Sequence, residues 1–392
     1  NQSSPSTFMA VGKQEARVRS TAGVKYGTGT AVGATWYAST YSYRKKFVID
    51  RTKVSGTSNL SNFPVLVSLT DADIKTTANG GKAASGSGEF VLTSADGTTV
   101  LDHEIESYTA TTGNLVAWVE VPTLSVSSDT VLYIYYGGPA AGSATNQNKT
   151  GVWDTDYMAV WHLSEGDSTA TNFYKDSTLG ANHGTLTDAD GDTNSVSCQM
   201  GSCMDFNGDA DDISMGTGLN ADTTMSFQWW ANFDIIDANF NGIIDKHGGG
   251  QTSNTSYGIS TLDTGSGVIR AFWSNGTSTC DQNYAYSTLN TWVHMGLVTD
   301  GTNMKWYING VNVENDSCTV DPQNQAYTAR LGSGFNRVAY LNARLDEVRI
   351  SDSVRSADWI KTEYNNQSSL STFYAVGKQE KLTRSVPGIQ IK

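Results

Sequence analysis

Three short acidic stretches contain the residues whose types and spacing could do chemistry. In "LDHEIESY", Asp102, Glu104 and Glu106 alternate along a predicted strand and therefore share one of its faces. Alternating carboxylates of this kind serve as nucleophile and acid in retaining glycosidases, where they lie about 5 Å apart. We prefer the simpler interpretation, a solvated strand face or a salt-bridged edge. Contact with an ion or a partner is the third alternative.

The stretch "DADGDTN" is a candidate calcium loop. It places oxygen ligands at alternate positions around a glycine: Asp188, Asp190, Asp192 and Asn194. Calcium prefers such ligands, and the glycine lets the chain turn sharply, although the bidentate glutamate of a complete EF-hand loop is missing. The stretch "DANFNG" at 237–242 resembles the same device more weakly.

A third acidic stretch, "NGDADD", offers a second calcium candidate. It contains Asp209, Asp211 and Asp212, and we expect the fold to bring Asp346 of "LDEVRIS" close to them. Calcium is therefore the expected cofactor, and the sequence leaves open which of the two clusters binds it.

Four cysteines predict two disulfides. Of the three possible pairings, we prefer Cys198–Cys203 and Cys280–Cys318, because each stays within one neighbourhood of the chain. Four free thiols are the alternative. A zinc site is less favoured, since no Cys-x-x-Cys occurs and the five histidines are scattered. Disulfides would indicate an oxidising, extracytoplasmic compartment.

Composition narrows the classes of partner. The chain of 392 residues carries a formal net charge of −13, with a pI near 4.7. This charge argues against nucleic acid and anionic membrane surfaces as partners. No apolar stretch approaches the roughly 20 residues that span a bilayer. Two domains are expected from the length, and three are the alternative.

The elements that must position these residues are predicted to be short strands. "NLVAWVEVP" and "NMKWYINGVNV" alternate with a period of two, and "ING" is a hairpin signal. Helical spacing is convincing only in "SADWIKTEY" at 356–364, where Ser356 can cap. We therefore expect an all-β protein of two β-sandwich (jelly-roll) domains in tandem, with one short helix near the C-terminus. Six tryptophans, which could form a sugar platform, are expected in the core: Trp161, Trp229, Trp230, Trp273, Trp292 and Trp306.

A repeat links the two ends of the sequence. Residues 1–15, "NQSSPSTFMAVGKQE", and residues 366–380, "NQSSLSTFYAVGKQE", are identical at thirteen of fifteen positions, at a constant offset of 365. Such long-period similarity is typical of arrays. We expect 366–380 to close the second domain, with 372–377 as its last strand. We then expect 1–15 to be the closing strand of a preceding repeat, or a strand donated to a neighbouring subunit. Its alternating assembly residues are Thr7, Phe8, Met9, Ala10 and Val11. Packing of 1–15 on the first domain of its own chain is the alternative.

The remaining segments follow from composition and from completed strands. We assign 16–40 as a linker, 41–140 as the first domain, 150–380 as the second and 381–392 as the start of another linker.

Several motifs resemble known families. "YSYRKKFVID", "SADGTTVLDHEIESY" and "YIYYGGPAA" resemble DUF2341, an extracellular domain of unknown function, over about 100 residues. "AVWHLSEG", "MDFNGDADDISMG", "WVHMGLVTDGTNMKWYINGV" and "RLDEVRISDSVRSADWIKTEYNNQ" resemble the laminin-G-like (LamG), concanavalin A-like jelly roll over about 220 residues, in family order. The second resemblance implies two sheets packed face to face, often calcium, and often carbohydrate or protein binding. It supports the Asp209 cluster and does not imply catalysis.

These observations favour a non-enzymatic extracellular structural protein. We expect a repeat or subunit of a cell-surface filament, sheath, S-layer or giant adhesin, linked head to tail with copies of itself. The alternative is a calcium-dependent carbohydrate-binding adhesin module that binds surface glycans, its repeats serving avidity. A glycoside hydrolase is a distant third.

Overall fold

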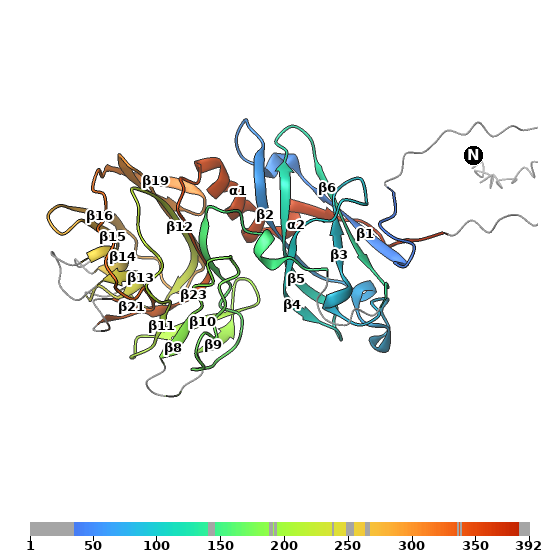
Figure 1. Ribbon diagram of the computed structural model, residues 1–392, viewed down its shortest axis with the longest axis horizontal. Coiled ribbons are helices and arrows are strands. Elements are labelled where there is room, and N and C mark those ends of the chain that lie inside the picture. Colours follow the sequence, from blue (N-terminus) through green and yellow to red (C-terminus); the bar gives the residue numbers. More distant parts are fainter. Residues whose placement is uncertain are drawn as a thin grey trace, which may run out of the picture. The chain divides into compact units, whose positions relative to one another are not determined.

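Two β-sandwiches account for most of the structure, a computed structural model (Figure 1). The residues that it describes belong to one compact unit. Among them, no helix is both long and apolar enough to cross a membrane. The described residues are 35–139, 146–187, 191, 194–236, 239–247, 255–262, 267–334, 337 and 339–383.

The first sandwich combines a sheet of order β24-β1-β6-β3, in which β25 also pairs with β1, and a three-stranded sheet of order β2-β5-β4. The alternating apolar run of β5 pairs with β2 from Leu60↔Leu124 to Thr70↔Asn114. Pro64 is tolerated in β2 because this strand lies at the edge of its sheet. The strands are β1 (Tyr43–Ile49), β2 (Leu60–Thr70), β3 (Val91–Thr93), β4 (His103–Thr109), β5 (Asn114–Leu124), β6 (Thr130–Tyr136), β24 (Tyr374–Val376) and β25 (Glu380–Lys381).

The second sandwich packs two larger antiparallel sheets. One has the order β19-β18-β17-β12-β23-β10-β9, with β7 paired to β23, and the other β16-β15-β14-β13-β20-β11-β8. The strands of the first are β7 (Tyr157–Trp161), β9 (Ser195–Ser197), β10 (Ser202–Asn207), β12 (Thr224–Phe233), β17 (Val293–Asp300), β18 (Asn303–Ile308), β19 (Val311–Ser317) and β23 (Asn342–Ser351). Those of the second are β8 (Thr185–Thr187), β11 (Asp212–Ser214), β13 (Gly242–His247), β14 (Thr255–Leu262), β15 (Val268–Ser274), β16 (Thr279–Ala285) and β20 (Arg330–Leu331); β21 (Ser333–Gly334) pairs with β22 (Ala339–Tyr340).

Local sequence signals explain these elements well. The predicted "ING" hairpin joins β18 and β19, and Asn309 and Gly310 both have positive φ, 51° and 71°, as a type I′ turn requires. Five of the six tryptophans expected in the core are buried, whereas Trp292 is half-buried. Both expected disulfides are present: Cys198–Cys203 and Cys280–Cys318.

The helical region is longer than the sequence predicts. Helix α1 (Ala357–Ser368) begins at the expected cap, where the Ser356 hydroxyl accepts a hydrogen bond from the Trp359 N–H at 3.1 Å. A second helix, α2 (Leu370–Phe373), follows directly. Short 3-10 helices are η1 (Arg51–Lys53), η2 (Ala72–Ile74), η3 (Thr77–Asn79), η4 (Ser87–Glu89) and η5 (Lys149–Gly151).

The C-terminal segment does not go where we expected. Residues 372–377 were predicted to close the second sandwich, but β24 pairs with β1 of the first sandwich, in the register Phe47↔Val376, Val48↔Ala375, Ile49↔Tyr374. In Figure 1 the red C-terminal segment accordingly lies beside blue strand β1. Local alternation predicts a strand but cannot predict its partner. The twin segment, residues 1–15, lies outside the described residues.

Two large apolar cores stabilise the unit, and a small cluster of Val298, Tyr307 and Ile360 lies beside them. One fills the space between the two large sheets. The other fills the first sandwich and continues to residues of the second, such as Val160, Trp230 and Trp359. Strand β12 is accordingly buried on both faces. The outer face of its sheet therefore packs against the first sandwich instead of facing water.

Candidate functional site

A buried carboxylate–histidine centre lies where the two sandwiches meet. We use this name for Glu106 of β4, His162 directly after β7, and Glu347 of β23. Each side chain offers one ligand atom, and these atoms lie within 4.8 Å of one another. All three side chains are at most 6% exposed. Among the described residues, this is the one group of three or more histidine, cysteine or carboxylate ligands at such distances.

Two β-bulges aim the carboxylates at His162. In β4 the pairing with β5 shifts between Ile105 and Ser107, which leaves Glu106 as the extra residue. In β23 the pairing with β12 shifts beside Glu347, whose φ of 51° is unusual for a residue other than glycine. Bulges re-aim side chains in this way, and strained backbone often marks functional sites.

His162 bridges carboxylates from both sandwiches. Its Nδ1 lies 2.8 Å from Glu347 Oε1 and 3.8 Å from Glu106 Oε2, and its Nε2 lies 3.4 Å from Glu104 Oε2. The imidazole stacks on the Trp118 ring at 5.7 Å. Burial opposes its charge, but the Glu347 and Glu104 carboxylates outweigh burial and raise the pKa of His162 well above its ordinary value.

A buried ion-pair chain extends from the centre into α1. Arg349 donates from Nη2 to Glu347 Oε2 at 2.8 Å and from Nη1 to Glu363 Oε1 at 2.9 Å. The guanidinium also lies over the Trp118 ring, 4.3 Å from its centroid. Burial disfavours the charge of Arg349, but Glu363 and Glu347 together raise its pKa. The chain therefore connects β23 of the second sandwich to the helix that leads back to the first.

Glu104 fastens β4 to the second sandwich. Its carboxylate accepts hydrogen bonds from Trp153 Nε1 at 3.2 Å and Ser177 Oγ at 2.8 Å, and Lys149 Nζ lies 3.5 Å away. Burial alone would raise the pKa of Glu104, but His162 and its other partners lower it to about 2.

Two carboxylates, Glu106 of the centre and Asp346 beside it, each have one oxygen without a hydrogen-bond partner among the described residues. Glu106 Oε2 accepts from Trp118 Nε1 at 3.0 Å, and Asp346 Oδ2 accepts from the Met200 N–H at 2.9 Å. Within the described structure, Glu106 Oε1 and Asp346 Oδ1 are buried without a hydrogen-bond partner. Burial, with a contribution from Glu347, raises the pKa of Glu106 to about 7 and that of Asp346 well above its ordinary value.

The solvated face that we preferred for "LDHEIESY" is therefore wrong for Glu104 and Glu106. Their side chains are 4% and 2% exposed, because the outer face of the second sandwich covers them. The arrangement offers buried nitrogen and oxygen ligands for a cation.

The residues predicted to bind calcium do not belong to the buried carboxylate–histidine centre. Asp188, Asp190 and Asp192 lie outside the described residues, whereas Asn194 is buried, and its N–H donates to Asp167 Oδ2 at 3.1 Å. We expected Asp209, Asp212 and Asp346 to converge, and they do not form one ligand group.

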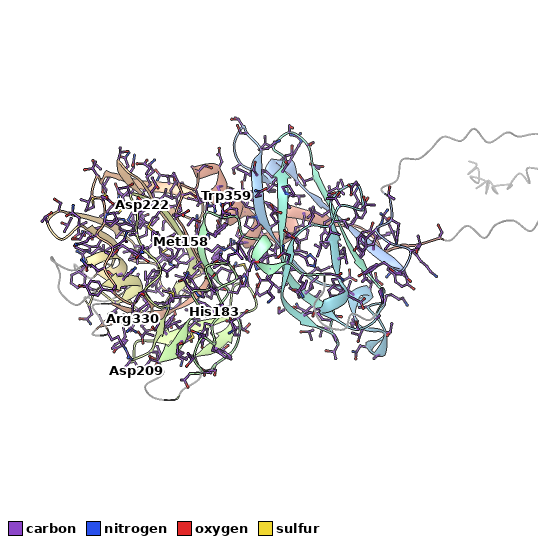
Figure 2. The ribbon with its side chains drawn as sticks, viewed as in Figure 1. Met158, His183, Asp209, Asp222, Arg330 and Trp359 are labelled. Carbon is purple, nitrogen blue, oxygen red and sulfur yellow. A yellow bond between two sulfur atoms is a disulfide. The ribbon has the colours of Figure 1, made fainter. Side chains whose placement is uncertain are left out.

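Each of these three aspartates has its own surroundings. Asp212 is buried between Arg330 and Arg337 and accepts from Ser333 Oγ at 3.0 Å. Asp209 is exposed on the second sandwich, where Figure 2 labels it together with Arg330. Asp346 lies beside the buried centre. Asp209 and Asp212 therefore differ in exposure although they stand in one acidic motif.

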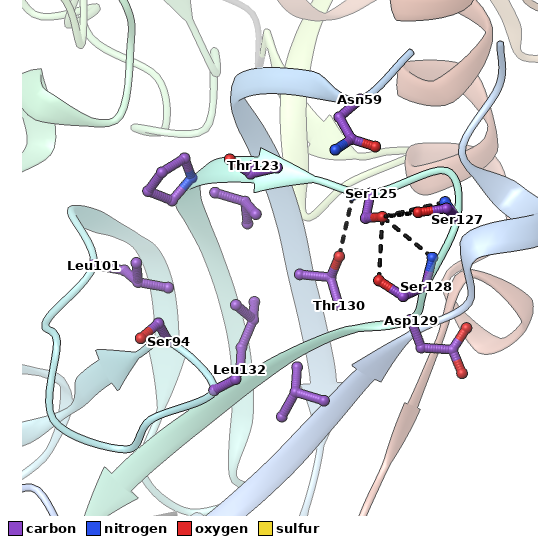
Figure 3. A pocket seen from close by; sticks show the side chains of 14 residues that line it. Asn59, Ser94, Leu101, Thr123, Ser125, Ser127, Ser128, Asp129, Thr130 and Leu132 are labelled. Carbon is purple, nitrogen blue, oxygen red and sulfur yellow. Dashed lines mark hydrogen bonds between the residues drawn. The ribbon is translucent and has the colours of Figure 1, made fainter. Parts of the chain in front are cut away.

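Two pockets lie on the described surface away from the buried centre, one on each sandwich. A polar pocket of about 400 Å³ lies on the second sandwich and is lined by Asn207, Gly208, Asp209, Ile235, Asn239, Asn241, Ala339, Tyr340 and Asn342. A pocket of about 580 Å³ lies on the first sandwich (Figure 3), where the hydroxyls of its rim bond one another: Ser125 Oγ contacts Ser127 and Ser128 at 3.2 Å. The second pocket also has an apolar wall, which includes Leu101 and Leu132.

Comparison with known families matches both parts of the chain. Residues 88–174 match DUF2341, a domain of unknown function, and residues 206–361 match Laminin_G_3, the concanavalin A-like lectin/glucanases superfamily. The chain joins a DUF2341 domain to a concanavalin A-like domain. The DUF2341 match contains Glu106 and His162, and the concanavalin A-like match contains Glu347. The buried centre therefore draws its ligands from both domains.

Solved structures resemble about half of this chain at low identity. Domain 4 of AbnA, a GH43 extracellular arabinanase from Geobacillus stearothermophilus in complex with arabinotriose, matches with TM-score 0.42 and 19% identity over 54% of this chain and 98% of that chain. The receptor-binding domain of botulinum neurotoxin D matches with TM-score 0.41 and 15% identity over 54% of this chain and 53% of that one. The binding domain of Paraclostridial Mosquitocidal Protein 1 matches with TM-score 0.41 and 15% identity over 53% of this chain and 52% of that one. Matches at this level carry no argument about ligands. Comparison with curated proteins gives no match.

Sequence reasoning missed two residues of the centre, His162 and Glu347. His162 is one of five scattered histidines but stands in "AVWHLSEG", and Glu347 directly follows Asp346 in "LDEVRIS"; both motifs carry the family resemblance. The signal was therefore present in the motifs "LDHEIESY", "AVWHLSEG" and "LDEVRIS", which supply one ligand each.

Proposed function

We propose that this chain is a non-enzymatic extracellular structural unit, joined to like units through segments 1–15 and 366–380. The observation that carries the proposal is the pairing of β24 with β1, since one edge strand accepts one strand on that side. Two segments of nearly the same sequence fit this single edge. The second copy therefore needs another acceptor of the same kind, which a like unit provides.

The contacts of segment 366–380 show which side chains a segment needs in order to bind the β1 edge. The Phe373 and Tyr374 side chains are buried in the core of the first sandwich. The Tyr374 hydroxyl donates to the Ser68 carbonyl at 2.7 Å and accepts from the Ser68 N–H at 2.9 Å. Further along, Glu380 forms an ion pair with Arg44 at 2.7 Å. Apolar burial, backbone pairing and charge therefore all contribute to binding.

The N-terminal copy retains most of these groups. At the offset of 365, Phe8 corresponds to Phe373, and Glu15 corresponds to Glu380. Met9 replaces Tyr374, which keeps an apolar side chain but loses the hydroxyl that bonds Ser68. We therefore propose that residues 1–15 bind the same edge in the same register, with somewhat lower affinity.

Pairing of this kind suits an extracellular filament, sheath, S-layer or giant adhesin. A unit that donates one strand and accepts another makes heterologous contacts, which generate open fibres when they do not close into rings. Covering the β1 edge also protects it from non-specific pairing. The two disulfides are consistent with an extracellular location.

The test is assembly of the purified chain, measured by analytical ultracentrifugation. Ala375→Pro removes a donor from β24 and should free the β1 edge, so we expect more end-to-end association. Deleting residues 1–15 from this variant should abolish the association and leave both sandwiches folded. Association that persists in the truncated variant would contradict the proposal.

Carbohydrate binding is the second candidate function, favoured by the polar pocket on the second sandwich. Amide and carboxyl groups with a tyrosine suit recognition of sugar hydroxyls, and the matched superfamily description names lectins. A glycan-array signal that Asn342→Leu abolishes would support it. If wild-type protein gives no signal, this second function is rejected.

The buried positions of Glu104 and Glu106 favour a structural role over a catalytic one. Glu104 and Glu106 are the carboxylates whose spacing suggested a glycosidase, and both are buried and engaged by tryptophan N–H donors. A glycan would have to separate the two sandwiches to reach them.

A further inference from the structure

The buried centre has the ligand set of a metal site. Histidine nitrogen combined with carboxylate oxygen suits zinc and other divalent first-row transition metals, whereas calcium prefers oxygen alone. Zinc ligands in a tetrahedral site lie about 3.4 Å apart, given metal–ligand distances near 2.1 Å. The distances from His162 Nδ1 to Glu347 Oε1 and Glu106 Oε2, 2.8 and 3.8 Å, lie on either side of that value.

The unpartnered oxygens point to a cation site independently of these distances. Glu106 Oε1 and Asp346 Oδ1 are buried without a hydrogen-bond partner in the described structure. An unsatisfied buried carboxylate oxygen is costly. Asp346 is fully buried, directly precedes Glu347 in β23 and interacts electrostatically with Glu347, Glu106 and His162. A divalent ion would satisfy the oxygens that the protein leaves unpaired.

The groups around the centre favour one arrangement. Arg349 donates a hydrogen bond to Glu347 Oε2, and the other oxygen of this carboxylate, Oε1, faces His162. Glu104 faces the other imidazole nitrogen, Nε2, at 3.4 Å. A carboxylate in that place orients a metal-bound histidine and fixes its tautomer. His162 Nδ1 is therefore the nitrogen that faces the metal position.

We propose that Glu106, His162 and Glu347 bind one divalent transition-metal ion, zinc being the best fit, with the buried Asp346 carboxylate adding negative charge beside the site. The ion would hold β4 of the first sandwich to β7 and β23 of the second. It is thus a structural site that connects the two domains, distinct from the calcium loops suggested by the sequence.

The test uses the full chain, stripped with a chelator and dialysed, then titrated with zinc against a chromophoric indicator and checked by elemental analysis. We expect one equivalent of zinc per chain. The isosteric double variant Glu106→Gln with Glu347→Gln should bind at least a hundredfold more weakly. The matched control Asp209→Asn, which changes an exposed carboxylate outside the centre, should bind like wild type.

Cobalt substitution makes the result independent of folding defects in the variants. In the stripped wild-type chain, cobalt should give visible bands typical of mixed nitrogen and oxygen coordination, and added zinc should remove them. Asp346→Asn, a milder change, should shift the bands while circular dichroism shows a folded chain. Absence of stoichiometric zinc and cobalt binding by folded wild type would overturn the proposal, as would unchanged affinity in the double variant.

Discussion

The side-chain amide of Asn366 spans both main-chain groups of Leu66, 300 positions earlier in the sequence. Its Oδ1 accepts from the Leu66 N–H at 2.7 Å, and its Nδ2 donates to the Leu66 carbonyl at 3.1 Å. All of these atoms are buried. The amide therefore takes the place of a neighbouring strand at the edge of β2 and fixes α1 against the first sandwich.

Asn366→Ala should destabilise the chain by about 1–3 kcal/mol, because it leaves the buried N–H and carbonyl of Leu66 without partners. Urea unfolding followed by fluorescence measures the change. Ser371→Ala, at an exposed position of α2, is the control and should stay within about 0.5 kcal/mol of wild type. Equal stability of the two variants would contradict the role of Asn366.

Arg349→Met should cost about 3–5 kcal/mol, because it leaves Glu347 and Glu363 buried without their cation. Arg344→Met is the matched control. Arg344 is 31% exposed and pairs with Asp205 and Asp234 at 3.2 and 3.5 Å, so its loss should cost at most about 1 kcal/mol. Chemical denaturation of both variants measures their free energies of unfolding. A similar loss in both would be evidence against a buried ion-pair chain.

The two disulfides should contribute unequally. Cys280 and Cys318 are separated by 38 positions and Cys198 and Cys203 by five. In the entropy model, the longer loop contributes about 4 kcal/mol and the shorter about 2 kcal/mol. Double Cys→Ser variants of each pair, unfolded thermally under otherwise equal conditions, measure the difference. The reverse order would show that loop closure does not govern their contribution.

Calcium binding by the "DADGDTN" loop remains a prediction from the sequence. Calcium at about 100 times its Kd should stabilise the folded chain by roughly 2.7 kcal/mol, and Asp190→Ala should remove the effect. Asp209→Ala should leave it unchanged, because Asp209 does not share a ligand group with Asp212 and Asp346. A melting temperature that is the same in EDTA and in excess calcium would show that no stabilising site exists.

The sequence predicted the elements better than their partners. The "ING" hairpin, the Ser356 cap and the buried tryptophans follow from local chemistry, and all three are present. The burial of Glu104 could not be predicted in this way, because it depends on the outer face of a distant sheet. The bulge at Glu347 was equally hidden, since it arises from the register between β12 and β23.

The repeat also predicted a closing strand at 372–377, but we expected that strand in the second domain, and it pairs with β1 of the first. Period-two alternation at 372–377 correctly indicated a strand, at 374–376. Its acceptor depends on α1, which runs longer than predicted and carries the chain to the first sandwich. Sequence identity between 1–15 and 366–380 therefore gained its meaning only once the β1 edge was known.

Disulfide trapping at the β1 edge tests the central claim most directly. Val48 pairs with Ala375, whose counterpart in the N-terminal copy is Ala10. The control variant, Val48→Cys with Ala375→Cys, should form a bond within one chain. In Val48→Cys with Ala10→Cys, combined with Ala375→Pro to free the edge, we predict a ladder of disulfide-linked chains on non-reducing gels. A reduced monomer, or a bond only within one chain, would contradict the claim that residues 1–15 join units.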